Sequence, residues 1–162
     1  MSFFVQATDA RKPKTKNVHT IAHTIALLYA GVMVLFSVTQ LFTFEAFIRL
    51  LDSFGLPGGV RVTHVLAAVI VITEVFALPF LLRMRLSPAM RVVSMVCCWL
   101  VALKWFGLTL WMMLSVNSIS NVGFLGDLFR LTPGWWAVLF SVALGILAAW
   151  ASWGMWPLAR KK

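Results

Sequence analysis

The stretch VTHVLAAVIVITEVFALPFLL, residues 62 to 82, is almost entirely apolar and contains one acidic residue, Glu74. A helix of this length measures about 30 Å, which matches the thickness of the hydrocarbon core of a bilayer. The sequence therefore predicts that Val62 to Leu82 forms a transmembrane helix with a carboxyl group near its middle.

Three further apolar stretches have the length of membrane spans, and they run from Thr20 to Phe44, from Val92 to Val116 and from Pro133 to Leu158. The whole chain is 61% hydrophobic and 12% charged, whereas soluble domains are about 45–50% hydrophobic and about 25% charged. The predicted fold is all-α: a basic cytoplasmic tail over residues 1–17, followed by one four-helix transmembrane bundle over residues 18–162.

Basic residues are concentrated in the segments that lie on one side of the four predicted spans. The chain has 14 Lys and Arg residues, and most belong to this side: Arg11, Lys12, Lys14, Lys16, Arg83, Arg85, Arg91, Arg160, Lys161 and Lys162. Such segments stay in the cytosol, so we predict a multi-pass protein of a bacterial cytoplasmic (inner) membrane with both termini inside. The net charge of +9 is then a topology signal, and we expect membrane lipids and other membrane subunits as partners, not nucleic acid.

Charged residues inside a span cost about 2.5–3.5 kcal/mol each near the helix centre, and two stand out, Glu74 and Lys104. Measured along their helices from the basic segment that joins them, their backbones differ in depth by about 6 Å, which a lysine side chain can bridge. The two residues have four interpretations: Lys104 extends outward while Glu74 is protonated or partnered elsewhere, or the two form an ion pair that fixes the helix register, a proton or ion relay, or a site for a polar headgroup or quinone. In the last case we expect Gln40 and His64 at the mouth of a cavity.

Other residues capable of chemistry form weaker patterns. His19 and His23 share a helix face, but no third ligand accompanies them, so we predict interfacial histidines, no metal site and no cofactor. Cys97 and Cys98, the only cysteines, are adjacent in an apolar span, where side chains point about 100° apart and do not easily bridge. We interpret them as buried apolar residues, and we predict no catalytic residue.

The segment from Glu45 to Gly59 follows the first span and carries apolar residues at helical spacing: Phe47, Leu50, Leu51 and Phe54. A segment of this kind lies flat at the membrane surface. It is either a simple connector at the outer interface or a docking surface formed by these four side chains.

The stretches FTFEAFIRLLDSFGLP (residues 42–57), TEVFALPFLL (residues 73–82) and NVGFLG (residues 121–126) occur in an order that resembles the MauE branch of the DoxX-like four-helix membrane proteins. The resemblance implies an acidic residue in the second helix, where Glu74 stands, and a link to disulfide chemistry and to the maturation of exported enzymes. It also implies a pair of cysteines in the loop before the last helix. Val122 and Phe124 occupy those two positions here, so the sulfur that thiol exchange requires is missing.

These observations leave three classes of function. The first is a non-catalytic membrane subunit, or an assembly or scaffold factor, of a larger membrane-associated complex. The second is a small transporter, or a binder of a polar ligand or quinone, that uses Glu74 and Lys104. The third is a thiol- or quinone-linked membrane oxidoreductase, which only the resemblance suggests. The replaced cysteines favour the first class.

Overall fold

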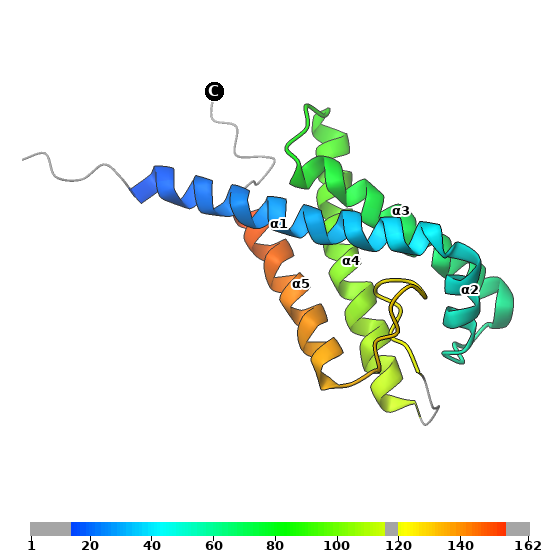
Figure 1. Cartoon of the computed structure of the whole chain (residues 1–162). Coiled ribbons are helices and arrows are strands. Elements are labelled where there is room, and N and C mark those ends of the chain that lie inside the picture. The colour runs from blue at the N-terminus through cyan, green and yellow to red at the C-terminus, as the bar shows by residue number, and fades with distance from the viewer. Residues whose placement is uncertain (1–13, 116–119, 155–162) are drawn as a thin grey trace, which may run out of the picture.

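The computed structural model describes residues 14–115 and 120–154, and this part of the chain is all-helical (Figure 1). The helices are α1 (Lys14–Phe42), α2 (Phe44–Asp52), α3 (Gly59–Leu81), α4 (Pro88–Leu114) and α5 (Trp135–Gly154). Helices α1, α3, α4 and α5 are long and apolar enough to cross a membrane, which confirms the predicted fold class. Helix α1 begins inside the segment predicted as a tail, and the rest of that tail, like the predicted end of the last span, lies outside the described residues.

The four long helices close into a bundle in which α1 and α4 each pack against both α3 and α5. Because successive spans alternate in direction, the start of α1, the connection between α3 and α4, and the end of α5 lie at one end of the molecule (Figure 1). We call this the basic end, since Arg83, Arg85 and Arg91 belong to it. The short helix α2 packs against α3 at the opposite end.

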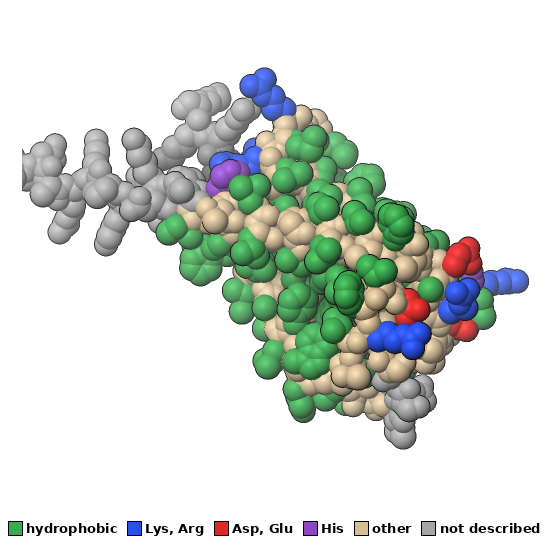
Figure 2. All heavy atoms as spheres, viewed as in Figure 1, with side chains coloured by type: hydrophobic (Ala, Val, Ile, Leu, Met, Phe, Trp, Pro, Cys, Tyr) green, Lys and Arg blue, Asp and Glu red, His purple; other side chains and the backbone are tan. Residues whose placement is uncertain are grey.

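The surface of the bundle is apolar around its middle. Figure 2 shows hydrophobic side chains over the central part of the molecule and charged side chains gathered towards its ends. Leu103 and Leu139, for example, are each 67% exposed. A continuous apolar surface of this kind is unfavourable in water and is solvated by lipid. The structure is therefore that of an integral multi-pass membrane protein.

Helix α3 contains a proline, Pro79, and α4 supplies a polar side chain at the same level. The Ser94 hydroxyl accepts a hydrogen bond from the backbone N–H of Phe80 at 2.9 Å and donates one to the carbonyl oxygen of Phe76. A proline disrupts the helical hydrogen-bond ladder, and backbone groups freed inside a bilayer need partners within the protein. Ser94 supplies such a partner and joins α3 to α4 near the basic end.

The connection before α5, residues 120–134, turns into the bundle, and we call it the inner loop. The side-chain oxygen of Asn121 accepts hydrogen bonds from the N–H groups of Gly123 and Leu131 at 3.1 and 3.2 Å. The side-chain nitrogen of Asn121 donates to the carbonyl oxygen of Gly126 at 3.1 Å. These bonds hold the loop in a compact form that buries the side chains of Val122 and Phe124.

The apolar face of α2 also points into the protein. Phe47, Leu51 and Phe54 are fully buried, and Leu50 is half-buried. Phe47, Leu50 and Phe54 lie against Gly123 of the inner loop. The interpretation of this face as a docking surface is therefore wrong for its three buried side chains, because the chain's own loop and core already cover them.

Gly126 is the tightest point of the inner loop. It adopts a φ of 59°, and a Cβ atom there would collide with the Thr43 hydroxyl oxygen and lie 3.1 Å from the carbonyl oxygen of Thr39. We expect Gly126→Ala to destabilise the protein by at least about 1–2 kcal/mol, the cost of a left-handed non-glycine residue. The measurement is the thermal unfolding midpoint in detergent, read by circular dichroism.

Gly31→Ala is the matched control, because it adds the same methyl group on α1, where nothing lies within 4 Å of the new atom. Alanine has a higher helix propensity than glycine, so the midpoint of this variant should stay constant or rise. Equal midpoints for Gly126→Ala and the wild type would contradict the close contact between the inner loop and α1.

Candidate functional site

The candidate site is centred on Glu74 of α3, whose side chain is completely buried. Its Oε1 atom accepts a hydrogen bond from the Lys104 ammonium group at 3.1 Å and another from the Trp105 indole N–H at 2.9 Å. Both donors come from α4. Because an indole N–H can only donate, Glu74 must present an acceptor to it, and the arrangement fits a carboxylate paired with an ammonium group.

The ammonium group of Lys104 is fully engaged by α3. Besides Glu74, it donates to the carbonyl oxygen of Ile70 at 2.6 Å and to the Thr73 hydroxyl oxygen at 3.0 Å. An ammonium group has three hydrogens to donate, so these three acceptors satisfy it. Only 12% of the Lys104 side chain is exposed. Saturation of this kind is what a buried ion pair needs if its attraction is to offset the cost of desolvation.

Gln40 of α1 connects this pair to the inner loop. Its side-chain nitrogen donates to the carbonyl oxygen of Phe124 at 3.1 Å, and Phe124 in turn packs against Trp105, the indole donor to Glu74. The second oxygen of Glu74 and the side-chain oxygen of Gln40 have no hydrogen-bond partner within the described part of the chain. The polar network thus draws on α1, α3, α4 and the inner loop, and it retains two free acceptor atoms.

Aromatic rings close the network on the side of the inner loop. The ring of Phe124 lies 4.6 Å from that of Trp105 and 5.6 Å from that of Phe36, with which it stacks. Rings of α5 complete the cluster, with Phe140 at 5.1 Å and Trp136 at 6.1 Å from Phe124. These centroid separations are typical of favourable ring pairs. Phe124 is therefore a central packing residue of the core.

The structure brings together some of the residues predicted from the sequence and separates others. Glu74 and Lys104 form an ion pair, one of the interpretations that the sequence left open, and Gln40 is buried. His64 is exposed in the first part of α3, where its Nδ1 atom lies 2.8 Å from the carbonyl oxygen of Val60. Ten residues separate His64 from Glu74, or about 15 Å along the helix, and the placement of Gln40 and His64 at a cavity mouth stays a prediction.

Sequence reasoning missed Thr73 and Trp105, which complete the bonding of the pair. Each is the chain neighbour of a charged residue, and on an ideal helix neighbouring side chains point about 100° apart. Both nevertheless contact the ion pair. Thr73 lies three residues after Ile70 on α3, so both present an oxygen to Lys104. Trp105 has a long side chain, and its indole N–H reaches Glu74. A membrane threonine or tryptophan next to a charged residue is the signal that could have identified them.

The remaining candidate residues do not form a second site among the described residues. Cys97 is half-buried, Cys98 is buried, and both thiols are free. No group of three His, Cys, Asp or Glu side chains is placed to hold a metal ion in residues 14–115 and 120–154. His23 is half-buried, and the side chain of His19 lies outside the described part.

Comparison with known proteins gives no identification, because no family model, curated protein or solved structure matches this chain. The likeness to MauE and DoxX-like proteins therefore rests on the sequence stretches quoted above and stays a prediction.

The ion pair leads to a reciprocal prediction. Glu74→Gln leaves the Lys104 charge buried without its counter-ion, and Lys104→Met leaves the Glu74 charge in the same state. Breaking a buried pair by removing one partner costs about 3–5 kcal/mol, so each single variant should unfold at a much lower temperature or fail to accumulate. The double variant Glu74→Gln/Lys104→Met removes both charges and should recover most of the lost stability in a double-mutant cycle.

Arg130→Gln is the control for charge removal as such. Arg130 lies 3.6 Å from Asp127 and its side chain is 75% exposed, and exposed pairs contribute about 0–1 kcal/mol. Its unfolding midpoint should remain close to that of the wild type. A double variant at Glu74 and Lys104 that is no more stable than either single variant would show that the two charges are not coupled.

Proposed function

We propose that this chain is a non-catalytic integral membrane subunit, or an assembly or scaffold factor, of a larger membrane-associated complex. In this proposal it resides in a bacterial cytoplasmic membrane with both termini in the cytosol, and it binds other membrane-protein subunits. The observation that carries the proposal is the position of Phe124. This residue fills the centre of an aromatic cluster. In the MauE branch of the DoxX-like proteins, which the sequence resembles, a cysteine is expected at this position.

The saturation of the ion pair supports the same proposal. All three donors of Lys104 are bound to α3, and one Glu74 oxygen has two donors from α4. A group that passes protons or ions must exchange its partners during the cycle, whereas these bonds lock α3 and α4 in one register. If the ion pair has only a structural role, a partner protein binds to the outer surface of the bundle, where most of the exposed side chains are apolar.

A second candidate is a transporter or a binder of a polar ligand, such as a lipid headgroup or a quinone. The second oxygen of Glu74 and the side-chain oxygen of Gln40 favour it, because both are buried acceptors without a partner. Buried acceptors are costly when left unbonded, and a ligand that donates hydrogen bonds would satisfy them. Phe124 contacts both Gln40 and Trp105 next to these acceptors.

One experiment separates these proposals. The tagged chain is purified from its native host in mild detergent, and the proteins that migrate with it are identified by mass spectrometry. The variant Glu74→Gln/Lys104→Met should retain the same partner and complement deletion of the gene, because it keeps the fold while losing the charges. The variant Cys97→Ala/Cys98→Ala should do the same, since no thiol takes part.

The outcomes are distinct. A folded Glu74→Gln/Lys104→Met variant that keeps the partner but fails to complement would favour transport or ligand binding. Loss of complementation in the cysteine variant alone would favour thiol chemistry. A wild-type chain that migrates alone, both in detergent and after cross-linking in the membrane, would contradict the subunit proposal.

A further inference from the structure

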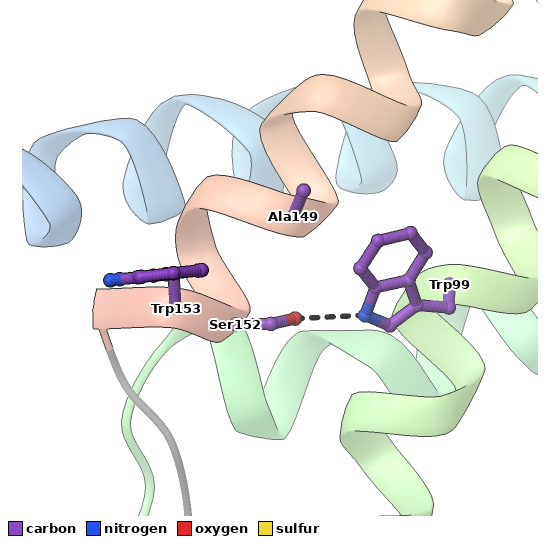
Figure 3. A pocket seen from close by; sticks show the side chains of 4 residues that line it. All are labelled: Trp99, Ala149, Ser152 and Trp153. Atoms are coloured by element: carbon purple, nitrogen blue, oxygen red, sulfur yellow. Dashed lines mark hydrogen bonds between the residues drawn. The ribbon is translucent and has the colours of Figure 1, made fainter.

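An apolar groove runs along the outer surface of the bundle between α4 and α5. Its first part is a hollow of about 490 Å³ flanked by the indole rings of Trp99 and Trp153, with Ala149 and Ser152 between them (Figure 3). The Trp99 indole N–H donates to the Ser152 hydroxyl oxygen at 3.0 Å. This bond pairs the polar atoms of Trp99 and Ser152 with each other, and the walls of the hollow are mostly apolar.

A second hollow of about 370 Å³ continues the groove towards the middle of the helices. It shares Trp99 and Ala149 with the first and is also lined by Ala102, Phe106 and Gly145. The groove is deep here because Ala102, Gly145 and Ala149 carry no large side chain. The rings of Trp99 and Phe106 form its sides. The two hollows thus form one elongated apolar site that faces the lipid.

The face of α4 that lines this groove continues to a basic residue. Arg91 lies eleven residues before Ala102, which is about three helical turns, so the two residues share a face of α4. From Arg91 to Phe106 the helix rises about 22 Å, and half of a bilayer including its headgroups measures about 20–22 Å. A phospholipid in one leaflet could therefore place its headgroup at Arg91 and its acyl chain in the groove.

The charge at this end of the molecule is strongly positive. Arg83, Arg85 and Arg91 form no ion pair within residues 14–115 and 120–154. Lys14 and Lys16, at the start of α1, also belong to this end, and none of its described residues is an Asp or a Glu. The three acidic residues Glu45, Asp52 and Asp127 belong instead to the segments of the opposite end. A partner held here gains from a negative charge.

We propose that this groove is a specific binding site for one anionic phospholipid of the leaflet at the basic end. An acyl chain lies between α4 and α5 against Ala102, Gly145 and Ala149, and the headgroup phosphate contacts Arg91. This site is separate from the buried Glu74 network and goes beyond the proposed subunit function, since it holds whether or not a protein partner exists.

The test is native mass spectrometry of the full-length protein, titrated with phosphatidylglycerol or with phosphatidylcholine of the same acyl chains. The wild type should retain one phosphatidylglycerol molecule about fivefold more strongly than phosphatidylcholine, as expected for a headgroup charge beside basic side chains. Ala149→Leu fills the part shared by the two hollows and should abolish retention of this lipid. Ala143→Leu is the matched control, because Ala143 is exposed on α5 but does not line the groove.

Two further variants keep the proposal falsifiable if Ala149→Leu does not fold. Trp153→Ala removes a wall of the hollow at a residue that is 88% exposed, and it should weaken retention of both lipids severalfold. Arg91→Gln should remove the preference for phosphatidylglycerol, whereas Arg130→Gln at the opposite end should preserve it. Equal retention of the two lipids by the wild type, unchanged retention in Trp153→Ala, or loss of a co-migrating protein instead of a lipid in Ala149→Leu would overturn the proposal.

Discussion

The rest of the bundle is built around the ion pair between Glu74 and Lys104. A charge inside a membrane protein is tolerated where it is paired and hydrogen-bonded, as the Lys104 ammonium group is by its three acceptors on α3. That requirement fixes α4 against α3, since Lys104 must reach the carbonyl oxygen of Ile70 as well as the carboxylate. It also fixes Trp105, whose indole N–H has its acceptor in Glu74. One pair therefore determines the register of two helices and the position of the largest buried side chain.

The inner loop depends on this core and also completes it. Phe124 contacts Trp105 and the rings of α1 and α5, and its carbonyl oxygen accepts from Gln40. The loop reaches this depth because Asn121 bonds its backbone groups internally and because glycine at position 126 allows close contact with α1. A cysteine at position 124 would leave part of this space empty, because a thiol is much smaller than the phenyl ring that packs here.

The spans and the similar depth of Glu74 and Lys104 were predictable from the sequence, because both depend on local properties, whereas the sequence left open whether the two charges pair. Hydropathy and length identify a membrane helix, and the rise per residue places Glu74 and Lys104 at similar depths. The role of α2 was not predictable in this way. Spacing shows that Phe47, Leu51 and Phe54 share an apolar face, but not whether lipid, a partner or the same chain covers it. The inner loop covers this face, and its inward course depends on long-range contacts such as Gln40 with Phe124, which no local pattern contains.

The interior of the bundle is held by specific hydrogen bonds and ring contacts, whereas its outer surface is apolar and contacts lipid. A transport cycle that moved Lys104 away from Glu74 would break its bonds to acceptors on α3, and one that moved Phe124 would separate it from four aromatic neighbours. Each of these losses is unfavourable in a medium that supplies no water to replace them. The outer surface carries no such restriction, because its apolar side chains exchange one lipid contact for another at little cost. The proposed roles, binding of a partner subunit and of a lipid, use this outer surface and the charge at the ends of the helices, and they leave the bonds of the core intact.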